Sequence, residues 1–268
     1  MSSAALIRAQ VEARLADRFP ATLTQRPPVE VRIMPTGVST IDAVVGGIPC
    51  GGITEIVGPS FCSTGRKSLQ AQLLAGASRE QFCALVDATD SFDPRSAQTA
   101  GVELKRVLWI RCGGRGVKTL EQAFKASDLL LQGSGGFGLI MVDLGGISER
   151  FVRKIPLTTW FRFRSVVEKL AAPLVFITPC PALGACSSLT LTLSAGQVRW
   201  SLPAPGPPAH ARIPEGWIFK SRLQRGARSR NLLNQFTASR RSGAGLSHAY
   251  CLHLRVALRC PGISALRA

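Results

Sequence analysis

The fold is constrained most by a regular alternation of short apolar runs and helix-like segments that begins at Thr36. The runs lie between turn-forming residues, as expected for strands buried on both faces of a sheet. Strands and helices in this order predict an α/β fold, a mainly parallel sheet covered by helices on both faces. The predicted strands are Ile53–Val57, Phe82–Asp87, Val107–Arg111, Leu139–Asp143 and Leu174–Thr178. The predicted helices are Lys67–Ala77, Pro94–Ala100, Thr119–Leu131 and Thr158–Leu170.

The alternation divides the chain into three parts. Residues 1–33 are predicted to form an amphipathic N-terminal helix and a Pro-containing linker, and residues 34–200 form the α/β core. Within the core, residues 189–193 and 197–200 are predicted to pair as an antiparallel hairpin at the sheet edge. Residues 201–268 are first Pro-rich and then rich in Arg, Ser and Gly, so we expect an irregular basic extension of low order.

The segment between the first strand and the first helix, GPSFCSTGRKSL, has the composition of a phosphate-binding loop. In such loops glycines let successive N–H groups point at phosphate oxygens, a Lys neutralises the phosphates, and a hydroxyl ligates Mg²⁺. The usual pattern has four residues between the glycines, whereas six separate Gly58 from Gly65 here. The sequence predicts binding of ATP and Mg²⁺ by this loop, through Gly58, Ser63, Thr64, Gly65, Arg66, Lys67 and Ser68.

Because the loop is longer than usual, its last residues can be aligned with the Lys and hydroxyl positions of the usual pattern in two registers. In the first, Lys67 contacts the phosphates, Ser68 ligates Mg²⁺ and the extra residues bulge. In the second, Arg66 takes the place of the Lys and Lys67 that of the hydroxyl, which leaves no Mg²⁺ ligand in the loop; an Arg can hold phosphate through two parallel hydrogen bonds. We prefer the first register. A strand-to-helix turn that binds no ligand is the remaining alternative.

Acidic residues at the ends of predicted strands are the next candidates. Asp143 ends an apolar strand, where a carboxylate can hold Mg²⁺ through water or can cap the next turn. Asp87 ends the second strand and could take part in the chemistry of the site or cap a turn, and we favour the turn cap. Asp93 and Pro94 have the residue types of a helix start, because Asp is a good N-cap and Pro suits the first helical position.

The positive charge is concentrated in the last hundred residues. Residues 169–268 contain 13 Lys or Arg and a single acid, Glu215, which gives +12 of the net charge of +17. A basic segment favours a polyanionic partner, most simply single-stranded DNA, although a solvated basic tail has the same composition. The candidate phosphate contacts there are Arg222, Arg225, Arg228 and Arg230.

A second nucleic-acid candidate is the predicted helix near residue 160. Arg162 and Arg164 alternate with aromatic residues, a combination that can stack on and neutralise single-stranded DNA. Core packing is the alternative that we prefer, with a buried helical face formed by Phe161, Val166, Val167 and Leu170.

The remaining composition narrows the class of protein. The eight cysteines are scattered without a C-x-x-C pair, so we expect reduced thiols and no zinc site. No apolar run reaches the roughly 18 residues of a membrane span, and the N-terminus lacks the pattern of a secretory signal. The sequence therefore predicts a cytoplasmic protein.

Four segments, taken in order, resemble the RecA recombinase family. Met34–Pro59 resembles the lead into the family's phosphate loop, and Cys83–Pro94 the strand and turn that carry its catalytic carboxylate. Ala100–Arg111 is similar to the third strand, and Gly135–Gly146 to the strand that bears the Mg²⁺-linked Asp. The resemblance covers about residues 34–193 and implies a RecA-like P-loop NTPase core.

The departures from the family concern its catalytic residues. Thr89 stands at the position of the Glu that activates the attacking water, and a neutral hydroxyl is a poor general base. The adjacent Asp90 is a weak substitute. Ser96 stands where the family has its adenine-stacking Tyr, and Pro179 where it has the Gln that senses the γ-phosphate. The two DNA-binding loops are also short.

The resemblance implies two alternative functions. The first is a RecA-like DNA repair and recombination protein that binds ATP and single-stranded DNA and is at most a weak DNA-dependent ATPase. The second is a non-catalytic scaffold, similar to SOS accessory proteins of the SulA and ImuA kind. It would dock on a recombinase or polymerase, or on a second copy, through the RecA-type interface.

Overall fold

The structure is a computed structural model in which two compact units are distinguished, residues 1–30 and residues 31–268, and the elements below belong to the second. The predicted N-terminal helix lies outside the described residues except for Ile7. Only the backbone is described for residues 196–200 and for the last two strands. The described residues are Ile7, 32–60, 64–114, 116–133, 136–200, 214–225 and 252–259.

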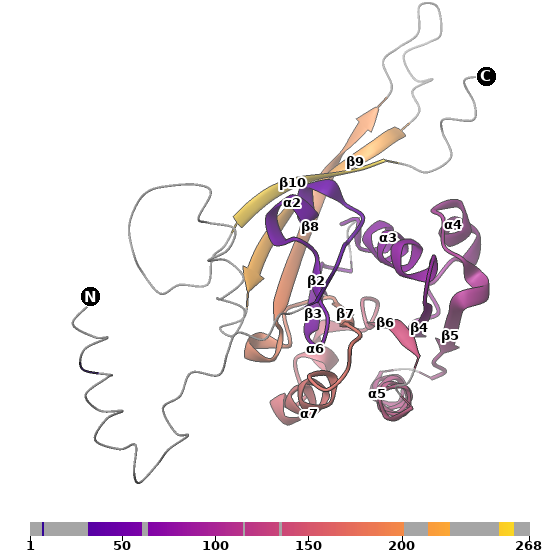
Figure 1. Ribbon diagram of the computed structural model, residues 1–268, viewed down its shortest axis with the longest axis vertical. Helices are drawn as coiled ribbons and strands as arrows, with labels where there is room; N and C mark the ends of the chain where they lie inside the picture. Colours follow the sequence, from indigo (N-terminus) through magenta and orange to yellow (C-terminus); the bar gives the residue numbers. More distant parts are fainter. Residues whose placement is uncertain are drawn as a thin grey trace, which may run out of the picture. The chain divides into compact units, whose positions relative to one another are not determined.

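The described core is built on an eight-stranded sheet with the order β10-β9-β8-β3-β7-β6-β4-β5 (Figure 1). The six strands from β8 to β5 are parallel, and β9 and β10 are antiparallel to their neighbours. The strands of this sheet are β3 (Ile53–Val57), β4 (Phe82–Asp87), β5 (Val107–Arg111), β6 (Phe137–Asp143), β7 (Leu174–Thr178), β8 (Leu189–Trp200), β9 (Pro214–Arg225) and β10 (Leu252–Arg259). A small separate sheet pairs β1 (Ile33–Met34) with β2 (Ile48–Pro49).

Helices cover both faces of the parallel strands. One face packs against α2, α3 and α4, and the other against α5 and α7, as the ribbon in Figure 1 shows. The helices are α2 (Ser39–Val45), α3 (Arg66–Ser78), α4 (Pro94–Thr99), α5 (Val117–Gln132), α6 (Glu149–Val152) and α7 (Leu157–Val167). The predicted α/β fold with a mainly parallel sheet is confirmed.

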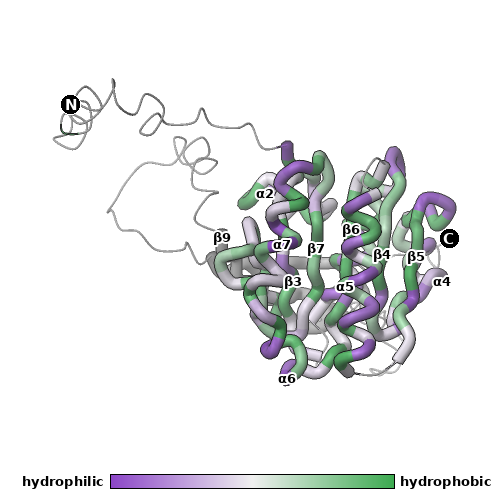
Figure 2. Tube along the Cα trace, turned by 90° about the horizontal axis from the view of Figure 1, so that it is seen from below, coloured by the Kyte–Doolittle hydropathy of each residue, from purple (hydrophilic) through white to green (hydrophobic). Residues whose placement is uncertain are grey.

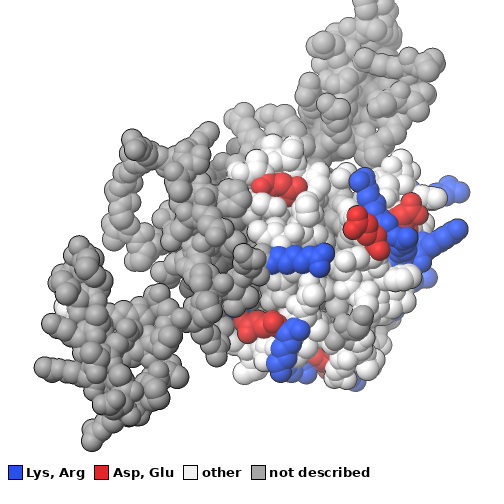
Figure 3. Space-filling view, viewed as in Figure 1, with Lys and Arg blue, Asp and Glu red and all other residues white. Residues whose placement is uncertain are grey.

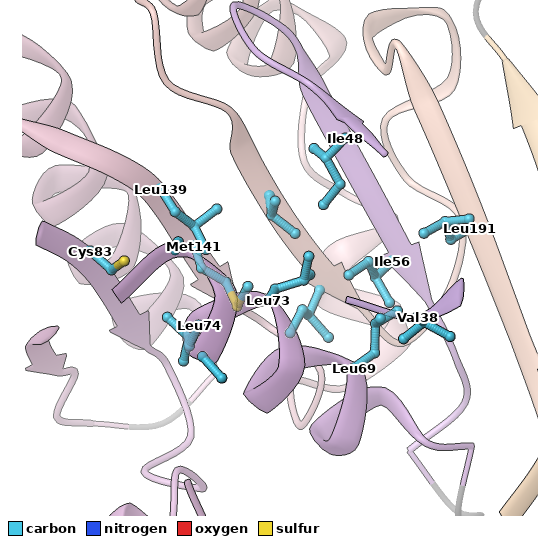
Figure 4. Close-up of a cluster of buried hydrophobic side chains, with 14 of the residues drawn as sticks. Val38, Ile48, Ile56, Leu69, Leu73, Leu74, Cys83, Leu139, Met141 and Leu191 are labelled. Atoms are coloured by element: carbon cyan, nitrogen blue, oxygen red, sulfur yellow. The ribbon is translucent and has the colours of Figure 1, made fainter. Parts of the chain in front are cut away.

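Successive residues of the central strands enter two different apolar clusters, one on each face. In β6, Leu139 and Met141 pack in the cluster with α3, whereas Ile140 and Val142 pack in the cluster with α5 and α7. Figure 4 shows side chains of the first cluster, and Figure 2 shows apolar residues along the central strands. Because both faces are buried, the strands are continuous apolar runs, the pattern that made them recognisable in the sequence.

The predicted strands and helices of residues 53–178 are confirmed with ends that shift by at most a few residues. Asp93 is the N-cap of α4, and its carboxylate accepts the N–H groups of Arg95 and Ser96 at 3.1 and 3.2 Å. The Pro at the first helical position supplies a φ angle already suited to a helix.

The structure corrects two expectations near the C-terminus. The predicted hairpin at residues 189–200 is wrong, because β8 is one strand whose pairing with β9 shifts in register between Ser194 and Gln197. A register shift accommodates the small residues that were interpreted as a turn. The segment 201–268 also contains regular structure, since β9 and β10 extend the sheet. Apolar residues alternate with other residues along β10, a strand pattern that the sequence interpretation missed.

Glu55 is a buried acid in the middle of β3 that anchors the segment after β7. Its Oε1 accepts the Thr178 hydroxyl at 3.1 Å and the N–H groups of Ala182 and Leu183 at 2.8 and 3.3 Å. Burial raises the pKa of Glu55 despite these three donors. The carboxyl group therefore fixes where the chain leaves the sheet after β7.

Replacing Glu55 by Gln is expected to flatten the pH dependence of stability. Because the pKa of Glu55 is raised above its ordinary 4.5, its contribution to stability is complete below that value and is lost as the pH rises through the folded-state pKa. Gln keeps a neutral acceptor for the three donors. The free energy of unfolding in urea should therefore fall less between about pH 5 and pH 8 in the Gln variant than in wild type.

Glu55→Ala is the matched variant. It leaves the N–H groups of Ala182 and Leu183 without their acceptor and should cost about 1–3 kcal/mol at either pH. If the free energy of unfolding changes equally with pH in the Gln variant and in the wild type, the raised pKa of Glu55 is contradicted.

Candidate phosphate-binding site

The candidate site lies at the carboxyl ends of β3, β4 and β6, the edge at which parallel α/β sheets bind ligands. Gly58 follows β3 directly, Ser91 lies in the turn after β4, and Asp143 is the last residue of β6. The helix α3 begins here, at Arg66. Residues 61–63 of the loop, including the predicted Ser63, lie outside the described residues.

The start of α3 is rich in hydrogen-bond donors. Gly65 is its N-cap, with a left-handed φ of 76° that favours glycine, and it provides no side-chain acceptor. No acidic residue occupies the first turn. The first N–H groups of a helix have no acceptors within the helix and carry a partial positive charge. This end of α3 therefore has the chemistry of an anion site.

The loop closes tightly over Gly58. A Cβ atom at this position would lie 2.7 Å from Thr64 Oγ1 and 2.8 Å from Arg66 Cδ. Thr64 is 2% exposed, and its hydroxyl oxygen has no hydrogen-bond partner in the described part of the chain. An unpaired buried hydroxyl is costly, so this oxygen marks the interior of the loop as a place for a polar ligand.

Lys67 connects α3 to two strand ends. Its Nζ atom lies 2.5 Å from Asp143 Oδ2 and 2.6 Å from Ser91 Oγ. The Asp143 side chain is 1% exposed and that of Lys67 is 50% exposed, so the ion pair is buried on one side only. The other carboxylate oxygen, Asp143 Oδ1, accepts the N–H of Gly145 at 2.8 Å.

Arg66 reaches the same turn after β6. Its Nη1 donates to the Gly145 carbonyl at 3.0 Å, and the Ser60 hydroxyl donates to that carbonyl at 2.7 Å. A Cβ at Gly145 would lie 2.5 Å from Arg66 Nη1, so a side chain at this position would displace the guanidinium from its present place. The loop and the turn after β6 are therefore joined by both Arg66 and Lys67.

These contacts favour the second register of the loop. Arg66 is the first residue of α3, and Lys67, rather than Ser68, is brought to Asp143. Ser68 lies one residue further along the helix and is exposed. The role of Ser68 and Asp143 as Mg²⁺ ligands stays a prediction.

The turn after β4 holds no carboxylate at the position of the family's catalytic Glu. The Thr89 hydroxyl lies 3.0 Å from Ser91 Oγ. Asp90 has a left-handed φ of 53° and forms an ion pair with Arg111, whose hydrogen bond lowers the pKa of Asp90. Asp87 accepts the N–H groups of Thr89 and Phe92 at 3.2 and 2.8 Å, which supports its predicted turn-capping role.

The helix α7 is placed mainly by core packing. Trp160, Phe163 and Val167 are buried, and Val166 and Leu170 pack partly buried against the same cluster. Of the predicted buried face, only Phe161 is wrong, since it is 50% exposed. The rings of Trp160 and Phe163 both pack against Phe176. The burial of these residues supports the core-packing alternative for this helix, with Trp160 and Phe163 added to the predicted face.

The arginines predicted to contact single-stranded DNA do not lie on one element of the described structure. Arg162 forms an ion pair with Asp128 at 3.0 Å, and Arg164 bonds Glu168 and the Ala185 carbonyl. On the face shown in Figure 3, basic and acidic side chains of the described core lie beside each other. Among the C-terminal candidates, Arg222 and Arg225 lie in β9, and Arg228 and Arg230 are outside the described residues.

The residues of the site that the sequence analysis did not predict are Ser60, Ser91, Gly145 and Arg111. Ser91 and Gly145 each follow a predicted strand by a few residues, so their position at the carboxyl edge was available as a signal. The pairing of Arg111 with Asp90 joins the end of β5 to the turn after β4 and has no local signature.

The parallel sheet and the loop between β3 and α3 define a RecA-like α/β core. Residues 5–147, more than half of the chain, match the family model of the RecA N-terminal domain. The chain therefore belongs to the RecA family. None of the helices in the described part of the chain has the length and hydropathy needed to span a membrane.

Several curated relatives carry the name RecA. The RecA protein of Rickettsia massiliae is 34% identical over 138 residues, which cover 50% of this chain and 38% of that protein. The RecA protein of Salinispora tropica is 32% identical over 141 residues, which cover 52% of this chain and 38% of that protein. The matched region thus spans well under half of the length of these relatives.

Replacing Gly58 by Ala is expected to destabilise the protein and to displace Arg66. The added Cβ would lie within 3 Å of Thr64 Oγ1 and Arg66 Cδ, so both side chains must move. We expect a loss of about 1–3 kcal/mol in the free energy of unfolding, measured by urea titration.

Gly76→Ala in α3 is the matched control. Nothing lies within 4 Å of a Cβ at Gly76, so the helical preference for Ala should stabilise the protein by about 0.5–1 kcal/mol. Equal effects of the two substitutions would show that the loop is not closed over Gly58.

Proposed function

We propose that this chain is a DNA repair and recombination protein that binds ATP and single-stranded DNA, with weak or absent ATP hydrolysis. The observation that carries the proposal is the donor-rich start of α3, where Gly65, Arg66 and Lys67 follow the end of β3. A triphosphate suits this position because helix N–H groups, a guanidinium and an ammonium all favour negative charge. Membership of the RecA family supports the same proposal.

The turn after β4 supports the absence of efficient hydrolysis. Thr89 has no carboxylate with which to take a proton from water, and its hydroxyl contacts Ser91. Asp90 is held in an ion pair with Arg111, and its lowered pKa makes it a weaker base. The chain would therefore bind nucleotide as a ligand rather than consume it rapidly.

The DNA part of the proposal depends on the basic C-terminal hundred residues. These residues contain 13 Lys or Arg and one acid, and this excess of positive charge provides a sequence-independent attraction for phosphates. Arg162 and Arg164 contribute less in this proposal, because ion pairs with Asp128 and Glu168 already offset their charges.

A scaffold function is the second candidate, and the turn after β4 favours it. A protein that acts by contact with a recombinase, with a polymerase or with a second copy needs no catalytic carboxylate. Thr89 and Pro179 are compatible with that role. A role in the SOS response is proposed only as part of this scaffold function.

ATP is expected to raise the melting temperature of the wild-type protein. A ligand present at 100 times its Kd stabilises the folded state by about 2.7 kcal/mol, which is a shift of several degrees for a domain of this size. Arg66→Ala should abolish most of the shift, and phosphate release should stay at background with or without single-stranded DNA. Differential scanning fluorimetry and a phosphate assay measure both effects.

Arg79→Ala is the matched control, because Arg79 is an exposed arginine at the opposite end of α3. It should leave the ATP shift intact. If millimolar ATP does not change the melting temperature of the wild-type protein, the nucleotide-binding proposal is wrong and the scaffold function remains. A repair phenotype unaffected by Arg66→Ala, despite ATP binding in wild type, would also favour the scaffold.

Removing two C-terminal arginines should weaken the salt dependence of DNA binding. Each phosphate contact to single-stranded DNA contributes a slope of about 0.7 in a plot of log affinity against log salt. Arg228→Ser combined with Arg230→Ser should reduce the slope by up to about 1.4, measured by fluorescence anisotropy. Lys118→Ser combined with Lys125→Ser on α5 is the control, and an equal loss there would contradict a specific role of the C-terminal residues.

A further inference from the structure

The strongest unexplained feature of the site is that Asp143 has a donor on each carboxylate oxygen. The Lys67 ammonium lies 2.5 Å from Oδ2, and the Gly145 N–H lies 2.8 Å from Oδ1. The side chain of Asp143 is almost fully buried at the end of β6. An acid in this position of a phosphate-binding core is expected to face a divalent cation, yet here it faces a cation that belongs to the chain.

The ammonium is held from two sides. Besides Asp143, the Nζ of Lys67 lies 2.6 Å from Ser91 Oγ in the turn after β4. The Ser91 hydroxyl is itself positioned by Thr89 and by Asp87, at 3.0 and 3.4 Å. Oxygen atoms from the ends of two neighbouring strands therefore surround one compact positive charge, an arrangement of the kind that a bound metal ion would otherwise have.

The residues present do not fit Mg²⁺. This ion requires nearly octahedral oxygen ligands and usually binds a carboxylate and a loop hydroxyl together with phosphate oxygens. The loop position that brings a side chain to Asp143 is occupied by Lys67, and Ser68 lies exposed on the next position of α3. A divalent cation beside Asp143 would also be repelled by the ammonium at close range.

The described residues nevertheless include the groups that an anion site needs. Gly65 begins α3 with no acceptor side chain, Arg66 lies across the loop, and the buried Thr64 hydroxyl has no partner among the described residues. The Arg66 and Lys67 side chains both reach the end of β6, where Lys67 pairs with Asp143, and the nearby Asp87 carboxylate is held by the N–H groups of its own turn. The site therefore offers phosphates a guanidinium and helix N–H groups without any added ion.

We propose that the Lys67 ammonium replaces the divalent cation, so that this site binds the polyphosphate group of a nucleotide independently of Mg²⁺. The inference rests on the proposed nucleotide binding and defines its ionic requirement. It also agrees with weak hydrolysis, because the ammonium is fixed on Asp143 and Ser91 and is not free to follow a leaving phosphate.

The first test compares the affinity of full-length wild-type protein for ATP in EDTA and in excess MgCl₂, by isothermal titration calorimetry. The Kd should differ by less than about threefold, and inorganic tripolyphosphate should bind in EDTA as well. Binding that is about tenfold or more tighter with Mg²⁺ would overturn the inference and leave nucleotide binding intact. No binding of ATP in either condition would overturn both.

Lys67→Thr is the second test, because it places a hydroxyl at the second position of α3 and frees Asp143. This variant should bind ATP about tenfold or more weakly in EDTA than in MgCl₂, and it should bind Mn²⁺ with ATP in an electron paramagnetic resonance titration. Lys118→Thr is the control and should behave as wild type. A folded Lys67→Thr variant without any Mg²⁺ or Mn²⁺ dependence would contradict the proposal, and the wild-type comparison decides the question if the variant fails to fold.

Discussion

Burial of the parallel sheet on both faces is the constraint on which the rest of this molecule depends. Alternate residues of a strand such as β6 fill different clusters, so both faces must be covered by helices. Each helix is reached by a connection that leaves the sheet at a strand end. The connections that follow β3, β4 and β6 carry polar side chains, and the sheet brings these together at one edge. The candidate site is a consequence of this arrangement.

Within that site, charge is balanced by the chain itself. Asp143 would be a buried, unpaired carboxylate without Lys67, and leaving such a charge unpaired is strongly unfavourable. The same pair joins the first turn of α3 to the end of β6, while Arg66 adds a bond to the Gly145 carbonyl. Thus the contacts that give the loop its positive charge also hold it against the sheet.

The sequence alone was sufficient to predict the elements that depend on local residue patterns. Apolar runs located five strands, and the Asp93-Pro94 pair located the start of α4. Spacing could not decide the loop register, because the decisive fact is the left-handed Gly65 that sets where α3 begins. Contacts between distant residues, such as Arg111 with Asp90, were equally inaccessible. The strands β9 and β10 were missed because β9 pairs with β8 and β10 pairs with β9, contacts that join residues separated along the chain.

A cation carried on a side chain differs from a bound ion in one respect that follows from the position of Lys67. An exchangeable ion has a dissociation constant and leaves when its free concentration falls, whereas a tethered charge is present at a fixed effective concentration whenever the helix is folded. The positive charge is therefore in place as soon as the protein folds, and no ion has to be bound from solution. Such a centre remains charged through fluctuations of the surrounding electrolyte, but it cannot be emptied or exchanged for another ion as a means of control.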